Sequence, residues 1–191
     1  MQTEAQEVFD LNQETKGTRS DYGSGQFANA CLAARRLVER GVRMVQVYYG
    51  NGQPWDDHGN IKLHRDKAKN VDQPIAALLR DLKARDLLDD TLVIWGGEFG
   101  RTPNVLTQRP PGGQHWPRCF SSIMAGAGIG GGRVYGKSDS RGGSVVSNPI
   151  RPEELSATIY HALDIPLNEP QNNTGISRPI TTGKPVMELF G

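Results

Sequence analysis

The strongest chemical signal in the sequence is the segment Trp55-Asp56-Asp57-His58-Gly59, which combines carboxylate and imidazole side chains. In extended backbone, residues i and i+2 point to the same side, so Asp56 and His58 are expected to converge while Asp57 points away. A carboxylate oxygen and an imidazole nitrogen are suitable ligands for zinc or a similar divalent ion. The pattern is short, and the alternative is an Asp and a His that cap turns of a loop.

A second chemical segment, Gly97-Glu98-Phe99-Gly100-Arg101-Thr102-Pro103, follows the apolar run Leu92–Trp95. Glu98 is the first charged residue after that run, where a carboxylate is well placed as a metal ligand or general base. Arg101 is expected to hold an anionic substrate, because its planar guanidinium matches phosphate or sulfate oxygens. We therefore predict Glu98 and Arg101 as catalytic residues. The alternative is an internal Glu–Arg pair that orders the loop.

A third segment, Gly113-Gln114-His115-Trp116-Pro117, offers a further imidazole. Taken alone, His115 has the alternative of a histidine in a surface loop. Together, the three segments supply two carboxylates, two imidazoles and one guanidinium, each close to the end of an expected strand. We predict a divalent metal site of Asp56, His58 and His115, with zinc as the expected ion and calcium, manganese or magnesium as alternatives.

Two glycine patterns imitate nucleotide-binding motifs. Gly126–Gly131 fits G-x-G-x-x-G, and Gly131–Ser138 fits the Walker A pattern. Both motifs deliver phosphate to a helix N-terminus. The residues after Ser138 include Gly142, Gly143 and Pro149 and have no helical period, so we expect a glycine-rich hairpin that binds no nucleotide.

The elements that would position these residues alternate between helices and strands. We expect helices over Thr3–Leu11, 27–40, 71–85 and 151–163, and strands at Val42–Tyr49, Thr91–Trp95 and Cys119–Ala127. This order predicts an α/β protein, namely a three-layer α/β/α fold with a largely parallel sheet. In such sheets, ligands bind beyond the carboxyl ends of the strands. The charged run Lys62–Lys69, which includes His64, is expected to be a solvated face.

Composition and charge exclude several classes of protein. The 191 residues include 22 Lys and Arg against 21 Asp and Glu, so the clustered basic excess of a general nucleic-acid binder is absent. The apolar runs are far shorter than the roughly 20 residues of a membrane-spanning helix. Met1–Asp10 is polar and acidic, unlike a signal or transit peptide. The two cysteines, Cys31 and Cys119, are too few for a disulfide framework or a four-thiolate zinc site.

Several motifs, in order, resemble a bacterial family catalogued as domain of unknown function 1501. The matching segments are Cys31–Arg43, Trp55–His58, Gly97–Pro103, His115–Pro117, Ala125–Ile129, Glu154–Leu163 and Lys184–Phe190. The resemblance covers roughly Gly25 to Gly191.

That family is similar to the alkaline phosphatase and sulfatase superfamily, whose members hydrolyse phosphate or sulfate esters with one or two metal ions. The resemblance implies an α/β/α fold in which Asp56, His58 and His115 hold one ion. A second ion is typically held by an Asp-His pair after a Thr-Leu-Val-Ile strand. Here Glu98 takes the Asp position and Phe99 replaces the His, and a phenyl ring cannot ligate a metal.

The resemblance also implies that the chain is the C-terminal half of such a protein, because the superfamily nucleophile lies near the N-terminus. Residues 1–24 would be an N-terminal helix and loop, 25–165 the C-terminal part of an alkaline phosphatase-like domain, and 166–191 its irregular tail. Longer members are often exported to the periplasm. The location of this chain stays open.

The leading functional hypothesis is therefore a metal-dependent hydrolase of sulfate or phosphate esters, inactive as this chain alone. Its substrate would be an anionic ester of a small molecule or glycan. The alternative is a non-catalytic module of the same fold that retains the metal. The expected partners are the missing N-terminal half or a second copy, because missing strands leave a sheet edge open.

Overall fold

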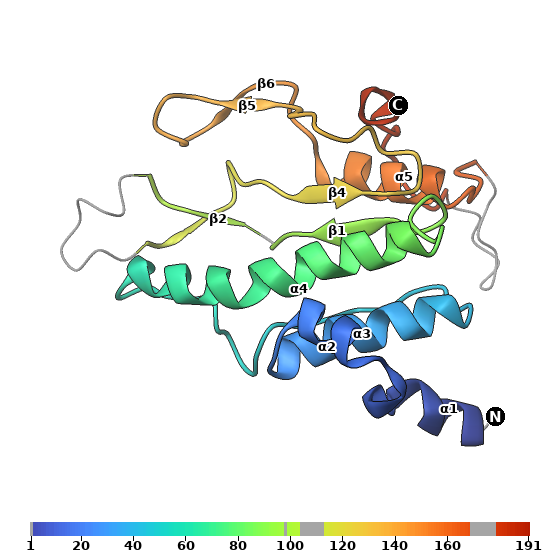
Figure 1. Cartoon of the computed structure of the whole chain (residues 1–191). Coiled ribbons are helices and arrows are strands. Elements are labelled where there is room, and N and C mark those ends of the chain that lie inside the picture. Colours follow the sequence, from blue (N-terminus) through green and yellow to red (C-terminus); the bar gives the residue numbers. More distant parts are fainter. Residues whose placement is uncertain (1, 98, 104–112, 169–178) are drawn as a thin grey trace. The chain divides into compact units, whose positions relative to one another are not determined.

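The computed structural model describes residues 2–97, 99–103, 113–168 and 179–191, which form two compact units. The first unit holds residues 2–87, 113 and 114, and the second holds 88–97, 99–103, 115–168 and 179–191. In Figure 1 the colour runs from blue at the N-terminus to red at the C-terminus. No helix within these ranges has the length and apolar character needed to cross a bilayer.

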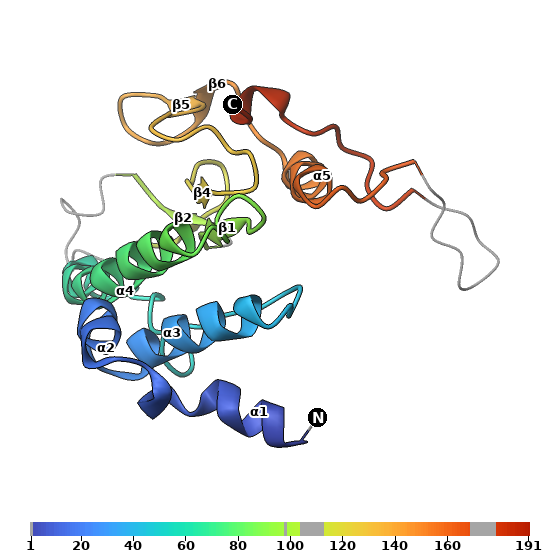
Figure 2. The ribbon, with the colours of Figure 1, turned by 45° about the vertical axis from the view of Figure 1, so that its right-hand side comes forward.

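The first unit is helical (Figure 2). Its helices are α1 (Gln2–Phe9), α2 (Lys16–Tyr22), α3 (Gln26–Glu39) and α4 (His64–Ala84), with the short 3-10 turns η1 (Leu11–Gln13) and η2 (Ile61–Leu63). The predicted helices correspond to α1, α3 and α4, whereas the prediction placed a loop where α2 forms. Helix α2 is polar and short, so it carries no apolar stripe. It is fixed instead by Thr15, whose Oγ1 accepts the Thr18 N–H at 3.0 Å.

The core of the first unit lies where α3 packs against α4 and α2 packs against both. Its centre is formed by Tyr22, Cys31, Leu32 and Ala77. The predicted helix at 27–40 is therefore confirmed, with Cys31 and Leu32 of α3 in this core. Burial raises the pKa of the Cys31 thiol to about 11, so this cysteine stays protonated and behaves as a small apolar residue.

Two adjacent arginines of α3, Arg35 and Arg36, are buried, with 1% and 4% of their surface exposed. Arg35 forms ion pairs with three carboxylates, those of Glu14 at 2.8 Å, Glu39 at 2.6 Å and Asp81 at 2.9 Å. Arg36 pairs with the same Glu14. Buried guanidinium groups require such partners, so this network ties α3 to α4 and to the segment before α2.

The prediction that Val42–Tyr49 is a sheet strand is wrong for the part of the chain described. None of the described strands pairs with it. Val47 packs against the helical core, and the Tyr49 ring lies 5.5 Å from that of Phe27. Alternating burial follows from extended backbone alone, whereas a sheet also needs a neighbour for its main-chain hydrogen bonds.

The second unit contains short antiparallel pairs. Strand β1 (Val93–Trp95) pairs with β4 (Ile123–Ala125), β2 (Gly100–Arg101) with β3 (His115–Trp116), and β5 (Lys137–Ser138) with β6 (Val145–Ser147). Helix α5 (Pro152–Ala162) and the turn η3 (Met187–Leu189) follow. Figure 1 shows β1 and β4 side by side.

These pairs contradict the predicted three-layer α/β/α fold with a largely parallel sheet. The described residues form five α-helices and three two-stranded sheets, all antiparallel. The prediction assumed a crossover helix between successive strands, which parallel pairing requires. The described residues between β1 and β4 contain no helix, so the two strands run in opposite directions, with Ile94 opposite Met124.

Helix α5 holds the C-terminal segment of the second unit in place. The Glu154 side chain accepts the Arg151 N–H at 2.8 Å and so caps the start of the helix. Thr158 is fully buried; its Oγ1 donates to the Glu154 carbonyl at 2.7 Å and accepts the Val186 N–H at 3.0 Å. One hydroxyl group thereby links the helix to the chain end.

Candidate functional site

The loop Gly50–Asn60 of the first unit brings Asp56 and His58 together. Asp56 Oδ1 lies 2.9 Å from His58 Nε2, and the side chains are 25% and 40% exposed. Two turn bonds shape the loop, Asp56 N–H to the Gln53 carbonyl at 3.1 Å and His58 N–H to the Asp56 carbonyl at 3.2 Å. The structure therefore provides an accessible oxygen–nitrogen pair where the sequence suggested one.

The distance within this pair is close to what a shared metal ion needs. Two ligand atoms about 2.1 Å from a tetrahedral zinc ion lie about 3.4 Å apart. The 2.9 Å between Asp56 Oδ1 and His58 Nε2 would open by roughly half an ångström on binding. Rotation of exposed side chains readily supplies such a change. The same distance also suits a direct contact between the two side chains, so the pair fits both metal binding and a role in shaping the loop.

Asp57 points away from the pair and anchors the loop to α4. Its Oδ2 lies 3.1 Å from His64 Nε2 and also pairs with Lys67. His64 Nε2 is also 2.8 Å from the Trp55 carbonyl oxygen, and the two rings meet edge to face at 5.5 Å. His64 is thus a structural residue, and these contacts at the start of α4 fix the backbone on both sides of Asp56.

The anchor was missed in the sequence, although a signal for it existed. His64 and Lys67 are three residues apart and so share one face of a helix, and Asp57 lies just before that helix. Lys62–Lys69 was interpreted as a solvated charged face. The structure shows that His64 and Lys67 turn inward, with side-chain exposures of 26% and 20%.

His115 and Arg101 are neighbours in the second unit. They are direct partners across the antiparallel pair β2–β3. The His115 ring lies against Phe99, with centroids 4.1 Å apart and planes inclined by 32°. The strand pair thereby places a guanidinium and an imidazole opposite each other, which suits an anion. Arg118 lies 5.6 Å from the centroid of the Trp116 ring, and Trp116 points to the opposite face of the strand from His115.

Of the predicted site residues, Asp56 and His58 lie in the first unit and Arg101 and His115 in the second. Glu98 lies outside the described residues, so its role as a base or ligand stays a prediction.

In the two glycine patterns, the structure shows a hairpin after Ser138 and a packing role for Gly126. No helix follows Ser138; the described residues there form the hairpin β5–β6, as the sequence indicated. Gly126 has φ +82°, and a Cβ on it would overlap the carbonyl oxygens of Thr91 and Leu88. The close approach of two backbones explains this glycine without a phosphate.

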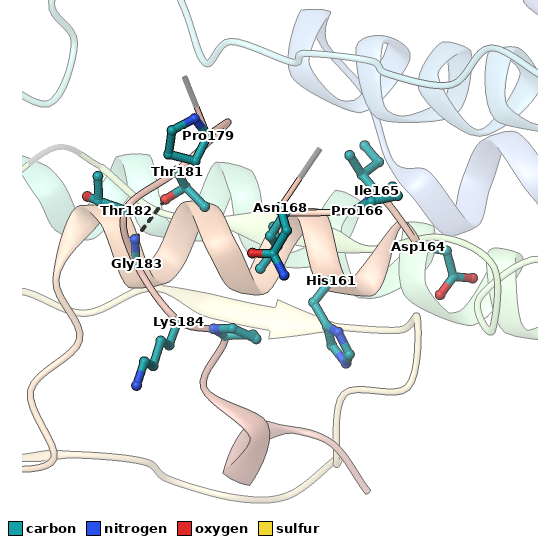
Figure 3. A pocket seen from close by; sticks show the side chains of 12 residues that line it. His161, Asp164, Ile165, Pro166, Asn168, Pro179, Thr181, Thr182, Gly183 and Lys184 are labelled. Atoms are coloured by element: carbon teal, nitrogen blue, oxygen red, sulfur yellow. Dashed lines mark hydrogen bonds between the residues drawn. The ribbon is translucent and has the colours of Figure 1, made fainter. Parts of the chain in front are cut away.

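A pocket of about 800 Å³ in the second unit lies at the end of α5 (Figure 3). Its lining includes His161, Asp164 and Lys184 and none of Asp56, His58, Arg101 and His115. Thr181 is also in the lining, and its hydroxyl already makes two hydrogen bonds within the protein. It donates to the Glu153 carbonyl at 2.9 Å and accepts the Gly183 N–H at 3.1 Å. Within the second unit, the pocket is therefore separate from Arg101 and His115.

Comparisons with curated proteins and with solved structures each gave no match. A comparison with family models matched one, described as a protein of unknown function (DUF1501), over residues 1–190. The match extends the resemblance seen in the sequence to the N-terminal segment. Because it covers nearly the whole chain, the protein belongs to the DUF1501 family of proteins of unknown function.

Proposed function

We propose that Asp56, His58 and His115 hold one divalent metal ion, and that the protein uses it to bind a phosphate or sulfate ester. The observation that carries the proposal is the Asp56–His58 pair, an accessible oxygen and nitrogen 2.9 Å apart on an anchored loop. Anchoring matters because ligands held in place lose less conformational entropy when an ion binds.

The donor set favours zinc over the harder cations. Two imidazole nitrogens and one carboxylate oxygen form a typical zinc ligand set, and a three-residue site leaves a position for water or substrate. Calcium and magnesium prefer oxygen ligands. We therefore expect tighter binding of zinc than of magnesium or calcium, with manganese between them.

The basic residues of β2 and β3 suit the anionic part of the substrate. The Arg101 guanidinium can donate two parallel hydrogen bonds to phosphate or sulfate oxygens. A bound divalent ion would supply charge stabilisation at an ester oxygen. Glu98, as proposed from its place after the β1 apolar run, would accept or hold a proton. The substrate class is an anionic ester of a small molecule or glycan.

A second candidate function is metal binding without hydrolysis. It is favoured by Phe99, whose ring lies 4.1 Å from that of His115 and offers no ligand for a second ion. Hydrolases of this chemistry often use two ions to stabilise both the attacking and the leaving oxygen. A single-ion module would retain binding and lose most of the rate.

Zinc titration by calorimetry tests the proposed site. We expect one ion per chain, with affinity reduced at least about tenfold in Asp56→Ala, His58→Ala and His115→Ala. The matched control is His161→Ala, which removes an imidazole that lies edge to face against the Phe190 ring, with the centroids 5.0 Å apart. Unchanged affinity in His58→Ala would refute the site, and unchanged affinity in His115→Ala would remove that residue from it.

Turnover of aryl phosphate and aryl sulfate, with each metal supplied separately, tests whether this chain is a hydrolase by itself. Zinc binding without turnover is the expected result, because the chain alone is expected to be inactive. Turnover that depends on zinc and is lost in Arg101→Ala, with zinc affinity kept, would contradict that expectation and exclude the non-catalytic module.

A further inference from the structure

The strand pair β2–β3 has two faces that carry different side chains. Arg101 and His115 are cross-strand partners, and so are Gly100 and Trp116. Because neighbouring residues of a strand point to opposite sides, Arg101 and His115 share one face and the Trp116 indole lies on the other. Each strand has only two residues, and a pair this short needs further contacts to keep its orientation.

The loop of the β5–β6 hairpin supplies such a contact on the Trp116 face. The Trp116 Nε1–H donates a partly buried hydrogen bond to the Gly143 carbonyl at 2.7 Å. Gly143 also lies beside the end of the β2 segment, because a Cβ built on it would be 3.5 Å from Pro103 Cγ. The hairpin loop therefore contacts the face of the strand pair that is opposite to Arg101 and His115.

Asp139 holds the hairpin loop in shape. Its Oδ1 accepts the N–H groups of Arg141 and Gly143, each at 2.9 Å, and its Oδ2 accepts the Ser144 N–H at 3.0 Å. The Asp139 N–H in turn donates to the Ser144 carbonyl at 2.9 Å. Hydrogen bonds from the Gly143 and Arg141 N–H groups lower the pKa of the Asp139 carboxyl below its usual 3.8. At neutral pH the carboxylate is therefore an ionised acceptor, which strengthens these bonds.

We propose that Asp139 and Trp116 are positioning residues for His115 and Arg101. Asp139 fixes the Gly143 carbonyl, and this carbonyl fixes the Trp116 indole. The indole then fixes the strand pair whose other face carries the two basic side chains. The inference rests on the proposed function, in which His115 binds the metal ion and Arg101 binds the anion. Residues that orient a metal ligand from outside the ligand set strengthen metal binding without touching the ion.

NMR of the metal-free protein tests the chain of contacts. The protein has three tryptophans, so each indole N–H can be followed separately. Asp139→Ala should speed hydrogen exchange of the Trp116 Nε1–H at least about tenfold, because the Gly143 carbonyl is no longer held. The same variant should shift the ring signals of His115. Asp139→Asn keeps an oxygen for the Arg141 and Gly143 N–H groups, so its effect should be intermediate.

Zinc titration tests the consequence for the proposed metal site. Trp116→Phe keeps an aromatic ring and removes the N–H donor, so it should weaken zinc binding about tenfold, as should Asp139→Ala. The matched control is Trp95→Phe, at a position of β1 that is 41% exposed, and it should leave the zinc affinity unchanged. Thermal unfolding checks that each variant is folded at the temperature of the titration, and Asp139→Asn replaces an alanine variant that is not.

Two results overturn the proposal. One is unchanged exchange of the Trp116 indole N–H in Asp139→Ala, and the other is unchanged zinc affinity in folded Trp116→Phe when the wild type binds zinc. A wild type that binds no zinc refutes the metal site itself. The indole and His115 signals of the metal-free variants then still decide whether Asp139 positions β3.

Discussion

The two units of this protein are stabilised in different ways. The first unit combines four helices with a buried apolar centre and a network of three carboxylates around Arg35. The second unit combines helix α5 with strands two or three residues long, and the strands of the β5–β6 hairpin are exposed throughout. A helix satisfies its main-chain hydrogen bonds within one segment, whereas a strand depends on a neighbour. Side-chain substitutions should therefore cost more stability in the first unit.

The largest expected effect is in the core of the first unit. Leu32, which is 2% exposed, should lose about 3 kcal/mol or more of unfolding free energy when changed to Ala, because the cavity left between α3 and α4 cannot collapse fully. The matched change in the second unit is Val146→Ala, at a position 61% exposed, with an expected loss within about 0.5 kcal/mol. Urea unfolding followed by far-UV circular dichroism measures both. Equal losses would remove the contrast between the units.

The next effect concerns the buried ion pairs. Glu14→Gln should destabilise the first unit by about 3 kcal/mol, because it leaves Arg35 and Arg36 buried with fewer counter-charges. The control is Glu39→Gln, because Glu39 is 36% exposed and surface pairs contribute about 1 kcal/mol or less. Hydrogen exchange of the α3 amides should report the difference. Similar protection in the two variants would show that the buried Glu14 contributes no more to stability than the more exposed Glu39.

A smaller loss of stability is expected in the second unit, at Gly126, where two backbone segments lie close together. Gly126→Ala should cost about 2 kcal/mol, because φ is +82° and a Cβ would meet the Thr91 and Leu88 carbonyl oxygens. Gly131→Ala is the control, since nothing lies within 4 Å of a Cβ there, and it should be nearly neutral. Thermal unfolding of both variants, compared with the wild type, makes the measurement.

The smallest effect is a pH dependence from Glu14. Burial alone would raise the pKa of this carboxyl, but hydrogen bonds from Arg36 and Arg35 outweigh burial and lower it below the usual 4.5. A lowered folded-state pKa means that the stabilisation is complete above the unfolded-state pKa and is lost as pH falls through the folded-state value. Wild-type stability should therefore fall more steeply below about pH 5 than that of Glu14→Gln. If the stability of the wild type and of Glu14→Gln falls equally steeply at acidic pH, the assignment to Glu14 is contradicted.

The sequence predicted the helices well because their signals are local. The stripe of Phe27, Cys31, Ala34 and Val38 defined α3, and the acidic start after Arg151 defined α5. It failed for the sheet, because Val42–Tyr49 and the runs around β1 and β4 indicate extended backbone but carry no information about which strand pairs with which. The buried Arg35–Arg36 pair was also missed, since its partners lie on α4 and on the segment before α2.

The candidate site was predicted in part for a similar reason. The spacing of Asp56 and His58 is a local property, and the structure brings these side chains together. The anchor formed by Asp57 and His64 depends on how the loop folds back on α4, which no pattern in the loop itself states. The role of His115 as a third ligand rests on order along the chain and on the family resemblance.

The central claim, a metal site of Asp56, His58 and His115, is tested most directly by NMR of the histidine side chains. The chain has only four histidines, so long-range proton–nitrogen spectra with zinc can report each imidazole separately. We predict that one equivalent of zinc shifts the ring nitrogens of His58 and His115 and fixes their tautomers, while the signals of His64 and His161 stay unchanged. Signals of His115 that do not respond, or equal responses from all four histidines, would contradict the account.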